Sequence, residues 1–428
     1  MDADDTPRRR IAVIGSGVAG LTAAWALREN AQVTLFEADD RLGGHAHTHD
    51  LADESGRLVS VDTGFIVHNR RTYPVLLRLL SELDVATQES QMSMSVVCEG
   101  CGLEYAGARK AAGLFPRARN AVQPRYLWML AEIVRFQRRA RRELRTAPTD
   151  LTTGSTLQEF VGRGRFSTYF VQHFVTPLVA CVWSCAPTTA MQYPARYLFS
   201  FLEHHGMLSI GGSPQWRTIT GGSRSYVDKV AKALTQVRLN NPVTALRRTA
   251  AGVELSDEDG QTYRFDAAVV ATHPHQALKL LAEPTQDERE VLGAIAYSVN
   301  ATLLHSDTSV LPSSGGAQAS WNYRMDSCAT SADQVLVSYD MNRLQRLDAG
   351  GRYLVTLGGA AVVDPSLVLD RMVYEHPVYT PSSVAAQQRL PGLDDERIVF
   401  AGAYHGWGFH EDGARSGRSA AHRLGSTW

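Results

Sequence analysis

Two glycine-rich segments near the start of the chain contain the residue types that bind a dinucleotide. The first, GSGVAG, runs from Gly15 to Gly20 with the spacing of the dinucleotide fingerprint. The first glycine permits a tight strand-to-helix turn, the second lets a pyrophosphate approach the backbone, and the third lets helix and strand pack closely. Glu37 follows 22 residues after Gly15, where its carboxylate can accept hydrogen bonds from ribose hydroxyls. The cofactor contacts predicted here are Gly15, Ser16, Gly17, Ala19, Gly20 and Glu37.

The second segment, RLGGHAHT, favours FAD over NAD. A glycine pair just after the acid suits a longer cofactor that folds along the domain. Arg41 can neutralise a phosphate, and Gly43 and Gly44 let the backbone pass close to it. The sequence therefore predicts FAD, with Arg41, Gly43, Gly44 and His45 among its contacts.

Histidines and aromatic residues supply the candidates for chemistry beside a flavin ring. His45 and His47 titrate near neutral pH when exposed, so either can carry a proton, and His47 is the predicted catalytic member. Tyr404 and Trp407 are predicted to form a wall against the substrate. The alternatives stay open, since each imidazole can be structural and each aromatic ring can belong to the core.

The C-terminal segment is expected to reach the same ring. A helix that opens near Asp412 and Gly413 can aim its positive end at the flavin, and Gly402 and Gly413 allow a close approach. Asp412 is a candidate both for cofactor binding and for capping this helix.

The elements that must position these residues can be read from apolar runs. Residues 11–14 predict a buried parallel strand, 18–28 a helix and 33–36 a second strand, which together make a βαβ unit. A helix is predicted at 72–84, and strands at 243–248, 253–256, 262–265 and 267–271. The C-terminus reads as strand, glycine loop and helix.

Four motifs, in order along nearly the whole chain, resemble the flavin amine oxidase and phytoene desaturase superfamily. They are VTLFEADDRLGGHAHT, TGGSRSYVDKVAKAL, NNPVTALRR and FAGAYHGWGFHEDGARSG. More narrowly, VDTGFIVHN, GLEYAG and GWGFHEDGARSG resemble a bacterial subgroup of predicted NAD/FAD-binding proteins. Genes of that subgroup often neighbour cyclopropane fatty-acid synthase-like methyltransferases, and some relatives are linked to modified fatty acids.

The resemblance implies an α/β fold, in which a Rossmann-like FAD-binding domain of the GR2 type carries an inserted mixed α+β substrate domain. It also implies that Val243 contacts the adenine through its backbone. Three positions depart from the superfamily pattern around the flavin. Ala403 replaces a glutamate, His45 replaces an arginine, and Arg415 stands where a small apolar residue is usual. These departures put amine chemistry in doubt.

We expect the FAD-binding domain to be assembled from residues 1–75, 219–290 and 391–428. The substrate domain then comprises a helical part, 76–218, and a mixed part, 291–390.

The net charge and the hydropathy of the sequence limit the kinds of partner and the location that we expect for this protein. The formal net charge is −1, which argues against nucleic acid. The N-terminus lacks the apolar core of a signal peptide, and the few cysteines suit a reducing setting, so a cytoplasmic location is expected. The basic helical region Arg125–Arg145 is either a solvated face or a peripheral contact with anionic membrane.

Cys98 and Cys101 form a single CxxC pair. Zinc would need two more ligands, and the spacing of Cys181 and Cys185 instead suggests one face of a buried helix. No metal is therefore predicted, and a redox disulfide is the other alternative.

The reaction expected is hydride transfer to flavin N5 from an apolar substrate, a fatty-acyl chain or lipid, giving oxidation, desaturation or isomerisation. Two rivals remain. One is a flavin amine oxidase, and the other is a non-catalytic flavin-bound partner of a lipid methyltransferase.

Overall fold

Five parallel strands from three distant parts of the chain form one central sheet. The computed structural model describes residues 8–53, 55–107, 110–146, 155–209, 211–329 and 334–428. In the order β10-β2-β1-β14-β20, the strands are Gln236–Arg238, Ala31–Phe36, Arg9–Ile14, Ala267–Val270 and Ile398–Phe400. The runs IAVI in β1 and AAVV in β14 are buried at every position, as in strands covered on both faces. The predicted α/β fold with its Rossmann-like domain is confirmed.

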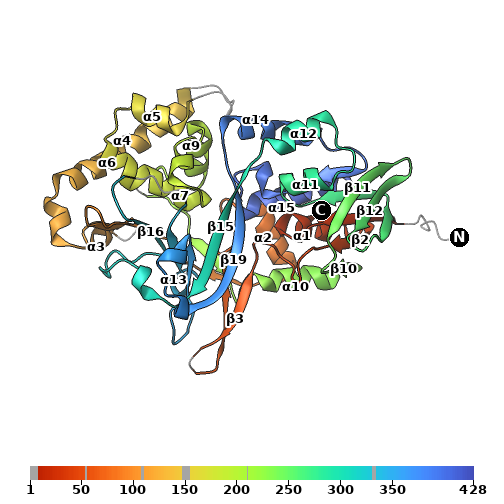
Figure 1. The fold of residues 1–428 in the computed structure, drawn as a ribbon, viewed down its shortest axis with the longest axis horizontal. Coiled ribbons are helices and arrows are strands. Elements are labelled where there is room, and N and C mark those ends of the chain that lie inside the picture. Colours follow the sequence, from red (N-terminus) through yellow and green to blue (C-terminus); the bar gives the residue numbers. More distant parts are fainter. Residues whose placement is uncertain (1–7, 54, 108–109, 147–154, 210, 330–333) are drawn as a thin grey trace.

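Two helices that are far apart in sequence pack together on one face of this sheet (Figure 1). Helix α1 (Val18–Leu27) is buried along its whole length, and α15 (His410–Arg423) lies against it. A Cβ on Gly417 would lie 2.1 Å from the carbonyl oxygen of Ala19, so a larger residue would push the two helices apart. Helices α2 (Pro74–Glu82) and α10 (Arg224–Ala233) share the same buried core, and α2 confirms the helix predicted at 72–84.

The opposite face packs against a small antiparallel sheet and three helices. The sheet contains β11 (Val243–Thr249), β12 (Gly252–Asp257) and β13 (Thr262–Phe265), as predicted. The helices are α11 (Pro274–Leu280), α12 (Gln286–Gly293) and α14 (Pro381–Arg389). Their buried side chains meet Ala12, Ile14 and Phe36 of the central sheet in one apolar cluster.

A seven-stranded sheet forms the centre of the second half of the molecule. Its order is β19-β15-β18-β17-β16-β7-β8. The strands are Val368–Pro377, Tyr297–His305, Leu354–Leu357, Val337–Asp340, Trp321–Met325, Met94–Cys98 and Leu103–Gly107. Strands β16 and β7 run parallel, and the other neighbours are antiparallel.

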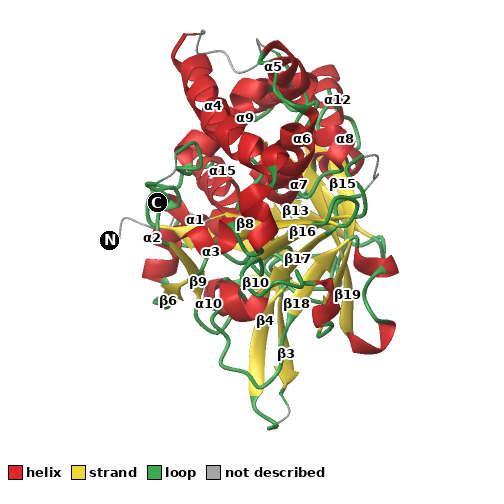
Figure 2. Ribbon diagram, turned by 90° about the vertical axis from the view of Figure 1, so that its left-hand side faces the viewer, coloured by secondary structure: helices red, strands yellow, loops and turns green. Residues whose placement is uncertain are grey.

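A layer of helices covers this sheet, and Figure 2 shows the helices gathered above the strands. They are α3 (Lys110–Leu114), α4 (Pro124–Thr146), α5 (Leu157–Arg163), α6 (Thr168–Phe170), α7 (Thr176–Trp183), α8 (Pro187–Ala190) and α9 (Ala195–His204). A π-helical turn, Val171–Val175, joins α6 to α7. Among the described helices, none has the length and hydropathy to cross a bilayer.

The region 76–218, expected to be helical, also contains strands. Besides β7 and β8, it includes β6 (Thr87–Glu89) and β9 (Trp216–Ile219), and β9 pairs with β6 on one side and with β5 (His68–Asn69) on the other. A separate hairpin of β3 (Thr48–Ala52) and β4 (Leu58–Asp62) projects from the body in Figure 1. A short helix, α13 (Met341–Leu344), follows β17.

Candidate functional site

The first glycine segment leaves open space in front of the N-terminus of α1. Gly15 has a φ of +97°, and a Cβ there would lie 2.9 Å from the carbonyl oxygen of Ala271. A Cβ on Gly20 would lie 1.9 Å from the carbonyl oxygen of Gly15, so both positions must stay small. At Gly17, by contrast, no heavy atom of the described residues lies within 4 Å of the Cβ position. A helix N-terminus facing free space can bind an anion.

The second glycine pair lies directly against this loop. A Cβ on Gly44 would lie 3.3 Å from the Cα of Gly17. The backbone N–H of Gly43 donates to the carbonyl oxygen of Ser16 at 3.2 Å. Arg41 donates from Nη1 to the carbonyl oxygen of Gly44 at 2.8 Å, which holds its positive charge beside the loop. The structure thus brings the two predicted motifs together around one space.

Glu37 directly follows β2, and its carboxylate and backbone carbonyl together connect three segments. Oε2 accepts hydrogen bonds from the backbone N–H of Ser16, at 2.9 Å, and from its hydroxyl. The backbone N–H of Asn241 donates to the carbonyl oxygen of Glu37 at 3.0 Å. That bond brings the start of β11, and with it the half-buried Val243, beside the acid.

The C-terminal glycines and Asp412 lie in the packing of α15. The carboxylate of Asp412 accepts hydrogen bonds from the backbone N–H groups of Trp407 at 3.0 Å and Phe409 at 3.1 Å, and from Arg415 at 2.7 Å. Burial raises the pKa of Asp412 to about 6, although Arg415 opposes that shift. In the structure, Asp412 therefore caps the start of α15.

The two glycines predicted near the flavin lie among close contacts. A Cβ on Gly413 would lie 2.5 Å from Cγ1 of Val18, so this position packs against α1. Gly402 follows β20, and its backbone N–H donates to the hydroxyl of Ser416 at 2.9 Å. Both glycines let the C-terminal segment lie close to the first glycine loop.

Tyr404 and Trp407 lie in different clusters. Tyr404 is buried in the core beneath the central sheet, and its hydroxyl has no hydrogen-bond partner among the described residues. Trp407 packs on the helical layer, with its ring 5.9 Å from that of Phe201. Phe409 stacks on Phe201 at 4.8 Å, and Trp183 donates to the carbonyl oxygen of Trp407 at 2.9 Å. An aromatic surface therefore joins the C-terminal segment to the helices, without Tyr404.

His47 begins a chain of hydrogen bonds that ends at a half-exposed carboxylate. Its Nδ1 lies 3.0 Å from the hydroxyl of Tyr374, which lies 2.6 Å from the hydroxyl of Thr63. Thr63 is 3.1 Å from Nε2 of His49, whose Nδ1 lies 3.0 Å from Asp370. The side chain of Asp370 is 50% exposed. This chain of groups can carry a proton between the half-buried imidazole of His47 and water.

Sequence reasoning missed four of these hydrogen-bonded residues, namely His49, Thr63, Asp370 and Tyr374. His49 lies on β3 and His47 directly precedes that strand, and the spacing of two residues places both imidazoles on the same side, with their ring centres 4.0 Å apart. That alternation was the available signal for His49. Tyr374 and Asp370 come from β19, which no local pattern connects with β3.

Asp62 is a further residue that the sequence analysis missed. Its buried carboxylate accepts hydrogen bonds from the hydroxyl of Thr48 at 2.6 Å, from the backbone and hydroxyl of Ser223 at 2.9 and 2.8 Å, and from the amide of Gln345 at 3.1 Å. Burial raises the pKa of Asp62 to about 6 against these hydrogen bonds. The carboxylate ties the β3–β4 hairpin to the loop before α10 and to the residue after α13.

The histidines around the site are held neutral. Burial, together with the imidazoles of His376 and His273, keeps the pKa of His45 well below its usual range. Burial and the charge of Arg41 lower the pKa of His47 to about 3. Near neutral pH both imidazoles are therefore uncharged.

We expect the protein to lose stability in mild acid. Burial lowers the pKa of His68, His376 and His405 to about 4, whereas histidine in an unfolded chain titrates near 6.5. Between about pH 6.5 and 4 the unfolded state binds more protons, so the free energy of unfolding falls as pH falls. Each such histidine contributes a slope of up to about 1.4 kcal/mol per pH unit. Urea unfolding at several pH values measures this slope.

Two histidine variants test whether the buried histidines cause this pH dependence of stability. Both ring nitrogens of His68 are buried and have no hydrogen-bond partner among the described residues, so His68→Leu removes one titration and no hydrogen bond. His68→Leu is expected to reduce the slope, and His422→Leu, at an exposed position, is expected to leave it unchanged. Equal stability at pH 7 and pH 5 in the parent protein would contradict the prediction.

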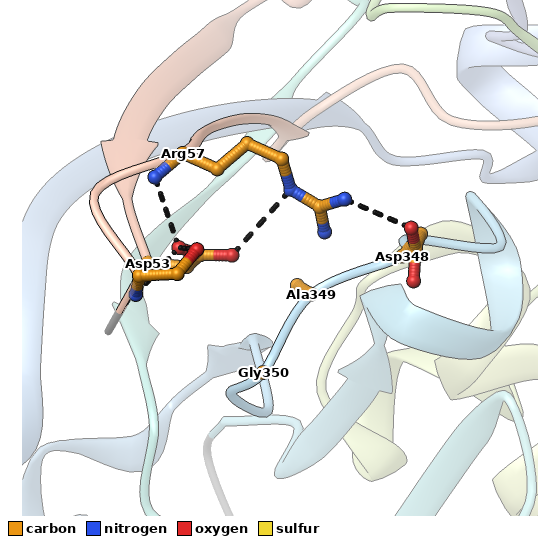
Figure 3. A pocket seen from close by; sticks show the side chains of 6 residues that line it. Asp53, Arg57, Asp348, Ala349 and Gly350 are labelled. Carbon is orange, nitrogen blue, oxygen red and sulfur yellow. Dashed lines mark hydrogen bonds and ion pairs between the residues drawn. The ribbon is translucent and has the colours of Figure 1, made fainter.

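The structure also has a surface hollow whose lining includes charged side chains (Figure 3). It lies at the tip of the β3–β4 hairpin, where Arg57 forms ion pairs with Asp53 at 3.6 Å and Asp348 at 2.8 Å. The side chain of Asp348 is 97% exposed. Exposed ion pairs of this kind contribute little energy, so the glycine-lined space remains the candidate site.

Comparison with known proteins decides the family. The sequence profile described as flavin containing amine oxidoreductase matches residues 18–425. The chain belongs to this family. Its cofactor is FAD, as the two glycine segments predict. The open space at Gly17, the neighbouring Arg41 and the carboxylate of Glu37 fit the phosphates and a ribose of this group.

Individual relatives are distant in sequence. The chain is 23% identical over 292 residues to (S)-6-hydroxynicotine oxidase of Paenarthrobacter nicotinovorans, an alignment that covers 65% of this chain and 63% of that enzyme. The match thus spans less than two thirds of that relative's length. The fold is similar to that of CLA-producing fatty acid isomerase from P. acnes, with a TM-score of 0.71, 16% identity and coverage of 99% and 100% of the two chains. It is also similar to cyclohexylamine oxidase from Brevibacterium oxydans, with a TM-score of 0.69, 17% identity and coverage of 98% and 99%.

Proposed function

We propose that this protein is an FAD-dependent oxidoreductase that oxidises, desaturates or isomerises an apolar substrate, a fatty-acyl chain or lipid. The observation that supports the substrate class is the aromatic surface between the C-terminal segment and the helices, in which Trp407 and Phe409 are partly exposed and pack on the buried Phe201 and Trp183. Burial of an acyl chain against such a surface contributes about 0.8 kcal/mol per CH₂. The fold neighbours include both a fatty acid isomerase and an amine oxidase, so the substrate must be decided by experiment.

The residues of this chain have separate tasks in the proposed reaction. Bound FAD supplies the acceptor for a hydride from a substrate carbon. The N-terminus of α1 and Arg41 hold the phosphates, and Glu37 holds a ribose. The proton that leaves the substrate passes through His47 and then along the hydrogen-bonded groups Tyr374, Thr63 and His49 to the carboxylate of Asp370. An oxidation or desaturation needs an external electron acceptor such as O₂ or a quinone. An isomerisation needs none, because hydride and proton return to the acyl chain of the substrate.

Anaerobic reduction of the bound flavin tests the substrate class. Loss of flavin absorbance with long-chain acyl substrates or membrane lipids, and not with simple amines, is the expected result. Mass spectrometry of the recovered lipid detects an isomerase, which leaves the flavin oxidised at the end. Rapid reduction by a small amine with no change in any lipid would instead establish an amine oxidase. A flavin that dithionite reduces and no substrate does, in protein that co-purifies with a lipid methyltransferase, would establish the non-catalytic partner.

Tyr374→Phe tests the proposed path of the proton. The substitution removes the hydroxyl that lies 3.0 Å from His47 and 2.6 Å from Thr63, and it leaves the ring in place. Because positioned proton transfer contributes about 10²–10⁴-fold, we expect flavin reduction by the substrate to slow by at least about 10-fold and to change its pH profile. Tyr126→Phe, which removes a hydroxyl that donates to the carbonyl oxygen of Leu114 at 2.6 Å in the helical layer, is the matched control. An unchanged pH profile in Tyr374→Phe would remove this chain of groups from the mechanism.

We also propose that α4 contacts anionic membrane. Its exposed side chains include Arg125, Arg138, Arg139, Arg142 and Arg145. Trp128 is 60% exposed and Leu127 is 41% exposed on the same helix. Exposed aromatic and apolar side chains beside arginines are typical of helices that lie in a membrane interface. Arg135 is different, because it pairs with Glu132 at 2.8 Å and its guanidinium lies 4.2 Å from the ring centre of Phe166.

The arginines that face solvent provide the test of membrane contact. We expect the triple substitution of Arg138, Arg139 and Arg142 by glutamine to weaken binding to anionic vesicles about 100-fold, since each basic residue contributes about 1 kcal/mol. Vesicle co-sedimentation measures this effect at constant flavin content. The same substitution of exposed Arg247, Arg264 and Arg289 is the matched control. Equal binding of the parent protein to neutral and anionic vesicles would contradict the proposal.

A further inference from the structure

Four potential metal ligands from three separate segments converge at one end of the seven-stranded sheet. Cys98 and Cys101 come from the turn between β7 and β8, Cys328 follows β16, and His173 lies in the π-helical turn before α7. One ligand atom of each residue lies within 4.8 Å of those of the other three. The CxxC pair visible in the sequence thus gains two partners, and they are not Cys181 and Cys185.

Two of the six separations between the ligand atoms match those of a tetrahedral zinc site, and all six are below 4.8 Å. Zinc binds sulfur at about 2.3 Å and imidazole nitrogen at about 2.0–2.1 Å, so the tetrahedron places two sulfurs about 3.8 Å apart and a sulfur and a nitrogen about 3.5 Å apart. The Sγ atoms of Cys98 and Cys328 are 3.7 Å apart. The Sγ of Cys101 lies 3.5 Å from Nε2 of His173.

The surroundings orient His173 as a ligand. Its Nδ1 donates to the carbonyl oxygen of Tyr169 at 2.9 Å, which leaves the lone pair of Nε2 directed at the cluster. Metal-bound histidines have such a hydrogen bond on the second nitrogen, because it fixes the tautomer and the ring. Tyr105 also donates to the carbonyl oxygen of His173 at 2.8 Å, which anchors the turn to β8. A π-helical turn is rare and is frequent at functional sites.

The backbone of the CxxC turn is shaped to admit the third cysteine. Gly102 has a φ of +67°, which glycine adopts without strain. A Cβ on Gly100 would lie 2.9 Å from the Cα of Ser327, so the absence of a side chain lets the segment with Cys328 lie against the turn. The N–H of Glu99 donates to the carbonyl oxygen of Met325 at 2.9 Å and fixes this contact.

We propose that Cys98, Cys101, Cys328 and His173 bind one zinc ion in a closed, structural site. Four protein ligands leave no open position for a substrate, which is the arrangement of structural rather than catalytic zinc. The ion fastens the β7–β8 turn and the end of β16 to the start of α7. The far end of α7 carries Trp183, which donates to Trp407, so the site also steadies the aromatic surface of the proposed active site.

Metal analysis of the flavin-containing protein, purified without chelator, tests this proposal. We expect about one zinc per chain by mass spectrometry of the elements. Replacement by Co²⁺ is expected to give the d–d bands of tetrahedral thiolate cobalt at wavelengths beyond the flavin absorption. Protein that contains no zinc, and that binds neither Zn²⁺ nor Co²⁺ after reduction, would overturn the proposal even if every variant failed to fold.

Variants and thiol counting assign the ligands. Cys328→Ser and His173→Gln alter different segments, and each is expected to lose zinc, whereas Cys181→Ala changes a buried cysteine outside the cluster and keeps it. All five cysteines should react with a thiol reagent after denaturation in chelator. Full zinc content in Cys328→Ser and His173→Gln would refute this ligand set. A disulfide between Cys98 and Cys328 in the protein as purified would refute the site itself.

Discussion

Replacement of Gly17 by valine is expected to give folded protein without FAD. Apart from the adjacent residues, no described heavy atom lies within 4 Å of the Cβ position at Gly17, so the protein has room for a side chain there. The added methyl groups occupy the place in front of α1 where the phosphates must approach the helix N-terminus. The fold should therefore persist while the flavin absorbance of the purified protein is lost. Absorbance spectra and circular dichroism measure the two properties separately.

Gly162→Val is the matched control for this prediction. Gly162 lies in α5, and its Cβ position also has no described heavy atom within 4 Å. The control lies outside the cofactor loop, and valine in the helix interior carries a larger conformational penalty there than at the extended Gly17, so it is a demanding test of the fold. It should retain full flavin content. A yellow Gly17→Val protein with full occupancy would show that the phosphates do not lie at this loop.

Asp62→Ala is expected to cause the largest loss of stability among single substitutions at the site. The change leaves the hydroxyl of Thr48, the backbone N–H of Ser223 and the amide of Gln345 buried without their acceptor. Each unsatisfied buried donor costs about 1–3 kcal/mol, so we expect a decrease of roughly 3–5 kcal/mol in the free energy of unfolding. Urea unfolding followed by fluorescence provides the measurement.

Asp50→Ala supplies the comparison on the same hairpin. Asp50 is exposed on β3, where it pairs with Arg224 and accepts a hydrogen bond from Ser60. Exposed pairs contribute little, so the loss should stay below about 1 kcal/mol. Similar losses for Asp50→Ala and Asp62→Ala would show that the hydrogen bonds of Asp62 do not hold the hairpin in place.

The FAD-binding fold could be predicted because its signals are local. The apolar run at 11–14, the glycines that follow it and Glu37 lie within one short stretch, and each restricts the chain by sterics or burial. The strands β7 and β8 were not predicted. β7 pairs in parallel with β16, about 230 residues later, and such pairing leaves no periodic mark that distinguishes the segment from its helical neighbours.

The same limit applied to the polar groups of the site. The sequence predicted four glycines of the site because they belong to two motifs, and the structure places these two motifs in contact. The glycines are Gly15, Gly17, Gly43 and Gly44. Tyr374 and Asp370 reach His47 and His49 across more than 300 residues of chain, through the position of β19. Cys328 likewise joins Cys98 from 230 residues away. Residues of these types are common, and a tertiary contact alone identifies which of them act together.

The contact between α1 and α15 has a consequence for biosynthesis. About 380 residues separate the end of α1 from the start of α15, and the position of Gly417 against Ala19 requires both helices to be present. Ribosomes add about 5–20 residues per second, so the first βαβ unit waits on the order of 20–80 s for its partner to emerge. During that interval the apolar faces of β1 and α1 lack their cover. Nascent chains of this protein are therefore expected to depend on chaperones, and cofactor loading must follow translation.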